Sequence, residues 1–514
     1  MFVSSLLAAL LLGAAAEAQP SSGSVVSETT CAGKTYTYKE LAGYGRLPGN
    51  MTDKFGDTLA GIGSSSAAEP SAWTKHRNGS YTGITWTLPD RGWNTQGTLN
   101  FQPRVHKFFM LFIPAPDATV DDPSPPNLEL FYLDSIAFTG PDGEPMTGLD
   151  ADVTGSITYP GFPDMPVTHF EGDGFGGDGP GGTRIPMDPE GLVLGKHGSF
   201  WISDEYGPFI YHFDCDGKMI GAIRPPEAYI PRRNGTVSFS ANSPPVYDPD
   251  RDVEPSEPDT GRNTNQGLEA LTASPDGKYL YSMIQSGMNQ EGGDEDETRR
   301  YARVLQYDIS CDPPTYRAEW VVSLPLYDDG EETAGQSEIK FISDTQFLVL
   351  ARDGDAGRGL EETESLYRHL DVFDISEATD VKDPQYDCAT CGVASRDGEL
   401  DEGITVAKYC PWLDFNINAE LGKFGLHNGG EQDDGLLNEK WEGLNLLPVE
   451  TEPHEWSGCD DYYLFAYSDN DFITQHGFMN GGALPYSDES GFELYNQVLV
   501  FKVSIPRHSN PLLG

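Results

Sequence analysis

Residues 189–223 decide the fold of this chain, and they read PEGLVLGKHGSFWISDEYGPFIYHFDCDGKMIGAI. Four short runs, at 189–194, 199–205, 209–213 and 219–223, are rich in aromatic, aliphatic and β-branched residues. Turn residues, including the pair Asp216-Gly217, separate them. Such runs between turn clusters are typical of β-strands. The stretch therefore predicts a four-stranded antiparallel meander.

The same pattern returns along the chain. Glu269, Glu338 and Glu442 each open a further copy, in the place that Glu190 has in the first. The expected strands lie at 268–272, 278–285, 303–308 and 316–322, at 337–341, 345–353 and 369–374, and at 441–445, 462–471 and 497–502. A weaker copy precedes the others, with strands at 59–64, 81–92, 108–112 and 128–132.

Repeated four-stranded units arranged radially make a β-propeller. Gly and Pro are spread along the chain rather than gathered into a linker, and no long amphipathic helix pattern is visible. We therefore predict a single all-β domain, a propeller of five or six four-stranded blades, with a sixth blade hidden in the divergent stretch 133–189. A two-sheet sandwich is the alternative, but it does not explain a glutamate that recurs at one place in the repeat.

The N-terminus predicts export from the cell. An apolar run at 6–12 is followed by Ala16-Glu17-Ala18, the pattern of a signal-peptide cleavage site. We expect a signal peptide at 1–18, an N-terminal segment at 19–58, the propeller domain at 59–505 and a C-terminal tail at 506–514. The protein is thus expected to be secreted and extracellular.

Export has consequences for glycans and cysteines. Sequons at Asn50, Asn78 and Asn234 predict glycosylation. Most cysteines should pair in an oxidising compartment, and an odd count leaves one free. The candidates are Cys31, Cys215, Cys311, Cys388, Cys391, Cys410 and Cys459. A bridge from Cys388 or Cys391 to Cys410 is expected, with the connectivity left open.

The charge excludes several classes of partner. The chain has 33 basic and 81 acidic residues, a formal net charge of −48. A polyanion needs a basic face, so neither nucleic acid nor an anionic membrane is expected to bind. The sequence also has no G-x-S-x-G and no H-E-x-x-H pattern, which excludes the signatures of α/β-hydrolases and common zinc proteases.

The recurring glutamates should meet at the centre of the propeller. Glu190, Glu269, Glu338 and Glu442 occupy one position on the first strand of each copy, which lies nearest the axis. Polar residues end the second strands: Asp204 and Glu205, Gln285, Arg352 and Asp353, Asp469 and Asp471, and Asp90 with Arg91.

Several carboxylates so close together raise one another's pKa unless a cation compensates them. Hard oxygen ligands suit Ca²⁺, which we predict as the cofactor. The alternative is that each glutamate caps backbone amides or pairs with Arg91, Arg352 or Lys340. Both arrangements can occur in one channel.

These phrases resemble those of the phytase-like family, which is named for an esterase-like activity of phytase. The resemblance is carried by Asp188-Pro-Glu-Gly-Leu192, Phe200-Trp-Ile-Ser-Asp-Glu-Tyr-Gly-Pro208, Asn265-Gln-Gly-Leu-Glu-Ala-Leu271, Ser274-Pro-Asp-Gly-Lys278, Trp441-Glu-Gly-Leu444 and Ser468-Asp-Asn-Asp471. It implies a β-propeller that hydrolyses phosphoesters or carboxylesters. The chain departs from this picture in having no basic run of the kind that clamps a highly phosphorylated inositol.

The leading hypothesis is a calcium-dependent hydrolase of small phosphoesters or carboxylesters that acts as a monomer. The expected metal ligands are Glu190, Asp204, Glu269, Glu338, Glu442, Asp469 and Asp471. Glu205 or Asp353 would be the general base, and Arg91 and Arg352 would anchor an anionic substrate. A lactonase-like reaction would use the same geometry.

A second hypothesis comes from another class. A non-catalytic, calcium-stabilised propeller would bind a carbohydrate or a protein at its loop-covered face, with Trp73, Trp93 and Trp456 as a sugar platform.

Overall fold

The computed structural model describes residues 25–450, 460–507 and 509–514, and the predicted signal peptide therefore lies outside the described residues. Within them the chain is built of strands β1 to β30, with two one-turn helices, α1 (Pro384–Asp387) and α2 (Asn418–Leu421). The predicted all-β fold is confirmed.

Three four-stranded sheets follow the repeat directly. In each, consecutive strands pair antiparallel in chain order. They are β10 (Pro189–Leu194), β11 (Phe200–Asp204), β12 (Ile210–Phe213) and β13 (Met219–Ile223); β16 (Leu268–Ala273), β17 (Tyr279–Ile284), β18 (Tyr301–Asp308) and β19 (Thr315–Ser323); and β22 (Gly335–Phe341), β23 (Gln346–Arg352), β24 (Arg368–Asp374) and β25 (Lys408–Asp414). The meander predicted for residues 189–223 is thus present.

A fourth, ten-stranded sheet joins the two ends of the chain. Its order is β26-β27-β30-β2-β7-β6-β5-β3, with β1 beside β2 and β4 beside β5. The strands are β26 (Trp441–Pro448), β27 (Asp460–Ser468), β30 (Asn496–Ile505), β2 (Lys34–Leu47), β1 (Ser27–Cys31), β3 (Ser65–Ala68), β4 (Thr74–Lys75), β5 (Tyr81–Leu88), β6 (Arg104–Phe112) and β7 (Leu128–Ala137). The strands β2 and β7 share one parallel partner pair, Gly45 and Leu128, so the sheet is two four-stranded units joined at a narrow seam.

The N-terminal segment completes the last unit. The strand β2 pairs antiparallel with β30 over nine partner pairs and supplies the fourth strand beside β26, β27 and β30. The sheets therefore extend beyond the boundary placed at residue 59. The first strand of the weak copy also differs from the expected 59–64, because β3 spans Ser65–Ala68 and pairs with β5 from Ser65 onward.

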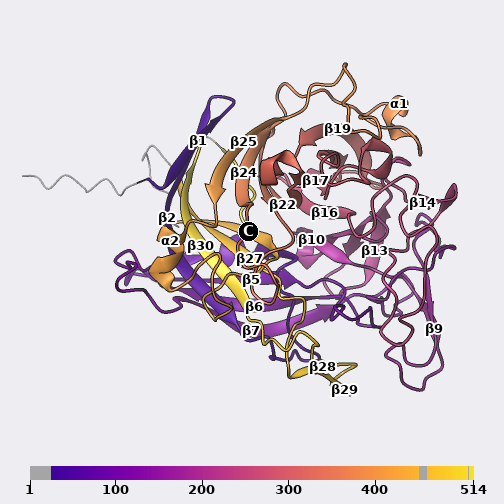
Figure 1. Cartoon of the computed structure of the whole chain (residues 1–514), viewed down its shortest axis with the longest axis horizontal. Helices are drawn as coiled ribbons and strands as arrows, with labels where there is room; N and C mark the ends of the chain where they lie inside the picture. Colours follow the sequence, from indigo (N-terminus) through magenta and orange to yellow (C-terminus); the bar gives the residue numbers. More distant parts are fainter. Residues whose placement is uncertain (1–24, 451–459, 508) are drawn as a thin grey trace, which may run out of the picture.

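The first strands of the units meet at the centre of the molecule. The strand β10 contacts β3 and β16, the strand β22 contacts β16 and β26, and β26 contacts β3. Figure 1 shows β10, β16 and β22 near the middle of the view and β13 and β19 farther out. The C-terminal residues end close to this centre, where the Leu512 amide donates to the Phe341 carbonyl.

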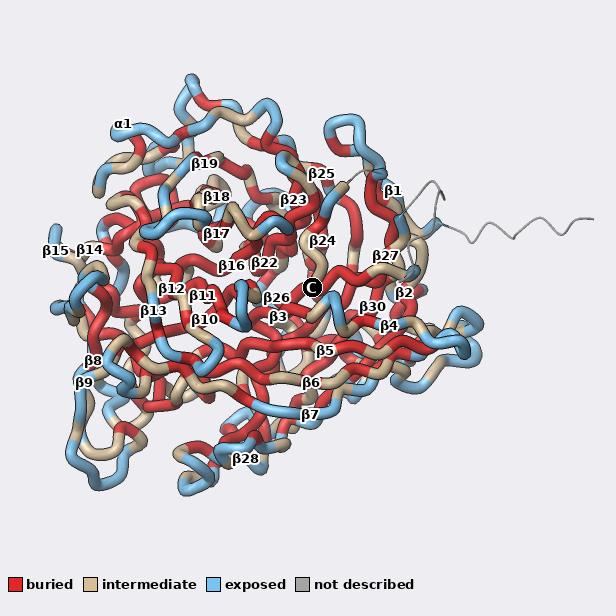
Figure 2. Tube along the Cα trace, turned by 180° about the vertical axis from the view of Figure 1, so that it is seen from behind, coloured by how far each residue is buried: buried red, intermediate tan, exposed pale blue. Residues whose placement is uncertain are grey.

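The second strands are buried on both faces. Every residue of β11 is buried, as are all but the first residue of β17 and all but the last of β23. Figure 2 shows the inner strands β10, β16 and β22 as buried. Alternation between an apolar and a polar face is therefore absent, as expected for strands packed between neighbouring sheets. This burial explains the nearly continuous apolar runs in the sequence.

Long connections carry the remaining strands. They form four short hairpins: β8 (Thr168–Phe170) with β9 (Gly182–Arg184), β14 (Arg232–Arg233) with β15 (Thr236–Val237), β20 (Leu326–Tyr327) with β21 (Glu332–Thr333), and β28 (Gly477–Met479) with β29 (Leu484–Tyr486). No helix among the described residues is long and apolar enough to cross a bilayer.

The disulfides differ from the expected pairing. Cys388 bonds to Cys391, and Cys410 bonds to Cys31, which lies 379 residues away in sequence. The prediction of a bridge between the CxxC pair and Cys410 is therefore wrong. The reason is the position of β1, which lies against β25 and places Cys31 beside Cys410. Cys215 and Cys311 are exposed and form no disulfide with another described residue, and Cys459 lies outside the described residues.

Candidate functional site

A β-bulge on three of the first strands carries the recurring glutamate. The pairing of β10 with β11 shifts between Pro189 and Gly191, so Glu190 is the extra residue. The same shift leaves Glu269 as the extra residue in β16 and Glu442 in β26. A bulge re-aims the side chain of its extra residue. These three glutamates are therefore equivalent in structure as well as in sequence.

The third copy is shifted by one residue. In β22 the pairing shifts between Gln336 and Glu338, which makes Ser337 the extra residue. Ser337 lines the central cavity and Glu338 does not. A one-residue slip on a strand turns a side chain to the opposite face. The sequence alignment that grouped Glu338 with the other glutamates was thus wrong by one position.

Glu338 fixes strands to one another. Its Oε2 accepts a hydrogen bond from the Ser65 hydroxyl at 2.6 Å, and its Oε1 accepts from the Ile339 amide at 2.9 Å and the Leu271 amide at 3.4 Å. Burial raises its pKa to about 7, although Lys340 and the three donors oppose this. This arrangement matches the alternative in which a glutamate caps backbone amides.

A polar cavity of about 360 Å³ lies where the first strands meet. Its charged lining residues are Asp90, Arg91, Asp188, Glu190, Glu205, Arg299, Arg352, Asp355, Glu439, Lys440 and Asp471. Its uncharged polar lining includes Asn94, Asn265, Gln266, Gln285, Ser286, Tyr327, Thr333 and Ser337. This is the size of a small-molecule site.

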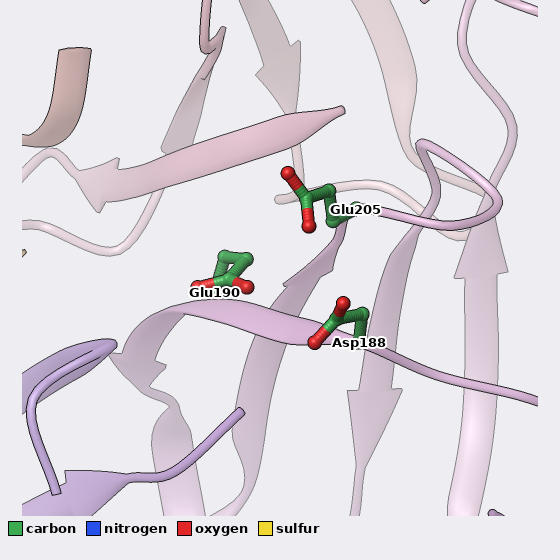
Figure 3. A group of neighbouring side chains, drawn as sticks. All are labelled: Asp188, Glu190 and Glu205. Atoms are coloured by element: carbon green, nitrogen blue, oxygen red, sulfur yellow. The ribbon is translucent and has the colours of Figure 1, made fainter. Parts of the chain in front are cut away.

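Three carboxylates converge on one wall of the cavity. Asp188 directly precedes β10, Glu190 lies in β10, and Glu205 directly follows β11. Each offers one carboxylate oxygen, and these oxygens lie within 4.8 Å of one another (Figure 3). All three residues are at most 5% exposed. We call Asp188, Glu190 and Glu205 the carboxylate triad.

The triad is short of positive charge. Burial raises the pKa of Asp188 to about 7, with Arg91 opposing and Glu205 adding to the shift. Burial also raises the pKa of Glu190 well above its ordinary value, and the neighbouring charges of Glu269, Asp188, Glu205 and Glu442 raise it further. Burial likewise raises the pKa of Glu205. Carboxylates in this state either take up protons or bind a cation.

Glu269 and Glu442 add further negative charge beside the triad. They are 3% and 1% exposed, and the Oε2 atom of each has no hydrogen-bond partner among the described residues. Burial raises the pKa of Glu269 well above its ordinary value, and Glu205 and Glu442 add to the shift. An unpartnered buried carboxylate oxygen is costly unless a cation or a donor meets it.

The basic residues of the cavity are paired with carboxylates. Arg91 contacts Asp188 at 3.0 Å, Lys440 contacts Asp471 at 3.0 Å, and Arg352 binds Glu442 at 2.6 Å. Arg352 also forms an ion pair with Glu439. Arg91 and Arg352 thus lie at the cavity, as predicted, but they hold the carboxylates of the protein in position. Lys440, which the sequence analysis did not single out, lies 3.7 Å from Asp90.

Two predicted site residues stabilise turns. Asp204 accepts hydrogen bonds from the amides of Asp188, Tyr206 and Gly207 at 2.9–3.2 Å. Asp353 accepts from the Ser365 hydroxyl at 2.9 Å and from two amides, those of residues 366 and 367. Neither lines the cavity. Their oxygens are occupied, which argues against metal binding by Asp204 and base catalysis by Asp353.

The two aspartates after β27 differ from each other. Asp469 does not line the cavity and accepts from the Asp471 amide at 2.6 Å and the Ser64 hydroxyl at 3.3 Å. Asp471 lines the cavity and binds Lys440. Asp90 also lines the cavity and is buried, and burial raises its pKa to about 7.

The tryptophans of the sugar-platform hypothesis are packed inside the protein. Trp73 and Trp93 are each 6% exposed, stacked on Tyr81 and Tyr486. Their indole nitrogens donate to the Pro448 carbonyl and to Asp488. Trp456 lies outside the described residues.

A sequence model of the phytase-like family, described as esterase-like activity of phytase, matches residues 118–472. This match covers more than half of the chain. The chain belongs to the phytase-like family. The matched part contains the carboxylate triad and the basic residues Arg299, Arg352 and Lys440, whereas Asp90, Arg91 and Asn94 of the cavity precede it.

The phytase-like chain is also similar to an uncharacterized secreted protein of Arthroderma benhamiae. The two are 53% identical over 476 residues, which cover 91% of this chain and 93% of the relative. With the disulfides described above, this relative confirms the prediction of secretion.

Two solved structures are similar to the phytase-like chain at low identity. One is an N-acetylgalactosamine deacetylase from F. plautii, with a TM-score of 0.30 and 9% identity, covering 91% of this chain and 95% of that one. The other is the Dos1 propeller, with a TM-score of 0.25 and 8% identity, covering 90% and 95%. Neither TM-score reaches 0.5, so these likenesses say nothing of substrate or metal.

Proposed function

We propose that this protein is a secreted, calcium-dependent hydrolase of small esters that acts in the central cavity of a five-bladed propeller. The observation that carries the proposal is the carboxylate triad: three buried carboxylates with oxygens within 4.8 Å of one another. Membership of a family named for esterase-like activity supports hydrolysis.

The contacts of the first strands support the proposal of five blades. The strands β3, β10, β16, β22 and β26 touch in a ring, and each begins a unit of four strands. The stretch 133–189, where the six-bladed alternative placed its extra blade, holds the end of β7 and the short hairpin β8–β9. That hairpin is too small to form a blade.

The residues fit a hard cation. The donors are carboxylate oxygens, the type of ligand that Ca²⁺ prefers. Glu269 forms no ion pair with a described residue, and the Oε2 atoms of Glu269 and Glu442 have no hydrogen-bond partner among the described residues, although Arg352 pairs with the other oxygen of Glu442. We propose that Asp188, Glu190 and Glu205 hold the ion. A bound calcium ion would polarise the carbonyl or phosphoryl group of the substrate and lower the pKa of a water molecule.

The surrounding residues have two further roles. Glu205 has two carboxylate oxygens, so one can join the cation site while the other accepts a proton from the attacking water. Arg91 and Arg352 are positioning residues, because their guanidinium groups hold Asp188 and Glu442. Both ion pairs keep the carboxylates at the centre of the molecule in fixed positions.

We also propose that the three sequons carry glycans. Asn50, Asn78 and Asn234 are all exposed, so a glycosyltransferase can reach each of them. Digestion of the secreted protein with an endoglycosidase, followed by mass spectrometry, would identify the occupied sites.

The enzyme proposal is tested with a small substrate panel. Phytate, a nitrophenyl phosphate, a nitrophenyl acetate and a lactone are offered to the purified protein with calcium and with a chelator. At least one should be hydrolysed, and the chelator should abolish the turnover. Glu205→Gln should lose this activity, while Glu338→Gln, the same change at a buried glutamate outside the cavity, should keep it. Turnover that survives the chelator would contradict the metal dependence, and no turnover on any ester would contradict the enzyme.

A further inference from the structure

We infer that the substrate of this cavity is an uncharged carboxylic ester rich in hydroxyl groups, and that a wall of side-chain amides recognises the hydroxyls. This inference rests on the proposed function, because it names the substrate class of the same site. It excludes phosphoesters, one of the two classes that the family resemblance implied.

The basic groups of the cavity are not free to bind an anion. The four basic side chains that line the cavity are Arg91, Arg299, Arg352 and Lys440. Each is already paired with a carboxylate: Asp188, Asp296, Glu442 and Asp471 at 2.6–3.0 Å. A phosphate dianion is normally bound by unpaired arginine or lysine donors. To bind one at Arg91 or Arg352, an ion pair would have to break and leave a buried carboxylate uncompensated, whereas the partners of Arg299 and Lys440 are partly exposed.

Carboxylates outside the triad add to the negative charge of the cavity. Asp90, Asp355 and Glu439 also line the cavity, in addition to the triad. Among the described residues, seven carboxylates and four basic side chains line the cavity. A single divalent cation at the triad leaves the cavity acidic. An anionic substrate would be repelled, whereas a neutral one would not.

Residues that flank β16 and β17 form an uncharged wall of the cavity. Asn265, Gln266, Gln285 and Ser286 line the cavity there, and we call them the amide wall. Gln285 directly follows β17, as Glu205 directly follows β11. The same position in two neighbouring blades thus carries a carboxylate in one and an uncharged amide in the other. This difference gives the cavity a reacting side and a neutral side.

The amide wall has free hydrogen-bonding capacity. The side chains of Asn265 and Gln285 form no hydrogen bond with another described residue, whereas Gln266 accepts one from Ser286. The backbone of Gln285 is fixed on both sides, since its amide donates to Gly267 and its carbonyl accepts from Gln336. A side-chain amide donates and accepts at once, and a hydroxyl group does the same. A polyol is therefore a fitting partner.

The reaction balances with water as the only co-reactant. The oxygen of water forms a bond to the ester carbonyl carbon, and the bond from that carbon to the alcohol oxygen breaks. One proton of the water passes to Glu205 and from there to the departing alkoxide. The products are a carboxylic acid and a polyol.

A matched pair of substrates tests the inference. Glucose 6-acetate and glucose 6-phosphate differ only in the acyl or phosphoryl group, and ethyl acetate lacks the sugar hydroxyls. With calcium present, kcat/KM for glucose 6-acetate should exceed that for glucose 6-phosphate about 100-fold. It should exceed that for ethyl acetate about tenfold. Equal or faster release of phosphate would overturn the inference.

A variant of the amide wall separates recognition from folding. Gln285→Ala should lower the preference for glucose 6-acetate over ethyl acetate about tenfold, because one hydrogen-bonding amide is lost. Gln385→Ala removes an exposed glutamine far from the cavity and should leave the preference unchanged. If Gln285→Ala slows both acetates equally, the amide does not recognise hydroxyls.

Binding distinguishes a failure of this inference from a failure of the proposed function. If no ester is hydrolysed, the enzyme proposal fails, but titration calorimetry with glucose and glucose 6-phosphate still tests the amide wall. Glucose should bind at least about tenfold more tightly than its phosphate. Tighter binding of the phosphate, or no binding of glucose, would overturn the inference regardless of activity.

Discussion

The strands β10 and β22 each contain one of the recurring glutamates, but the two side chains make different contacts. In β10 the bulge falls on Glu190, which reaches the carboxylate triad. In β22 the bulge falls on Ser337, and Glu338 turns away to bind the Ser65 hydroxyl and two backbone amides. The difference teaches that the position of a bulge, and not the residue type, decides whether a glutamate on a first strand joins the carboxylate triad or binds backbone amides.

The largest expected effect is on catalysis. Glu190→Gln should lower kcat/KM about 1,000-fold, because it removes a charged ligand of the proposed cation site. Glu338→Gln should stay within about twofold of the wild type, since this residue does not line the cavity. Steady-state kinetics on the best ester of the panel measures both. Equal losses in the two variants would remove the distinction between the strands.

The next largest expected effect is on the stability of the protein, and it comes from a substitution in β22. Glu338→Leu leaves the Ser65 hydroxyl and the Ile339 amide without an acceptor and Lys340 without its nearby carboxylate. We expect a loss of about 3 kcal/mol in the free energy of unfolding, measured by urea denaturation. Glu190→Leu, measured in chelator, should lose less, since no hydrogen bond to a described residue depends on that side chain. A larger loss for Glu190→Leu would reverse our assignment of the two roles.

Calcium should stabilise the Glu338→Gln variant and not the Glu190→Gln variant. A ligand at 100 times its Kd adds about 2.7 kcal/mol to the free energy of unfolding. We expect millimolar calcium to raise the Tm of the wild type and of Glu338→Gln by several degrees, and to leave Glu190→Gln unchanged. Differential scanning calorimetry, with magnesium as the control ion, measures the shift. A Glu190→Gln variant that still responds to calcium would place the ion elsewhere.

The smallest expected effect is a difference in how the free energy of unfolding depends on pH. Burial raises the folded-state pKa of Glu338 to about 7 from its ordinary value of 4.5, so folding takes up a proton on this group between these values. The protonated Glu338 side chain therefore stabilises the folded state at low pH. This stabilisation is lost as the pH rises through 7, by up to about 1.4 kcal/mol per pH unit.

Glu338→Gln should remove this component. Unfolding free energies of wild type and variant, measured in urea at pH 5 and pH 7.5 with chelator present, give the difference in slope. Parallel slopes would mean that Glu338 keeps its ordinary pKa in the folded state.

The sequence predicted much of the candidate site. It singled out Glu190, Glu269 and Glu442 from the repeat, and Glu205 from the polar end of a second strand. It missed Asp188 and Lys440, yet each lies two residues before a bulge glutamate, at equivalent positions of two copies. Comparing the copies at that position would have found both. No comparable signal marks Asp204 and Asp353 as structural, because only the turns that follow them supply the donors to their oxygens.

What the sequence determined by itself is the architecture of the units and the residues gathered at the hub. Short apolar runs between turn clusters are local features, so they specify four-stranded meanders without knowledge of the rest of the chain. The tertiary structure alone decided three things: the addition of β2 to the last unit, the Cys31–Cys410 bridge and the one-residue shift in β22. Each depends on pairing between distant segments, and the partner of a strand edge is set by packing that no local pattern records.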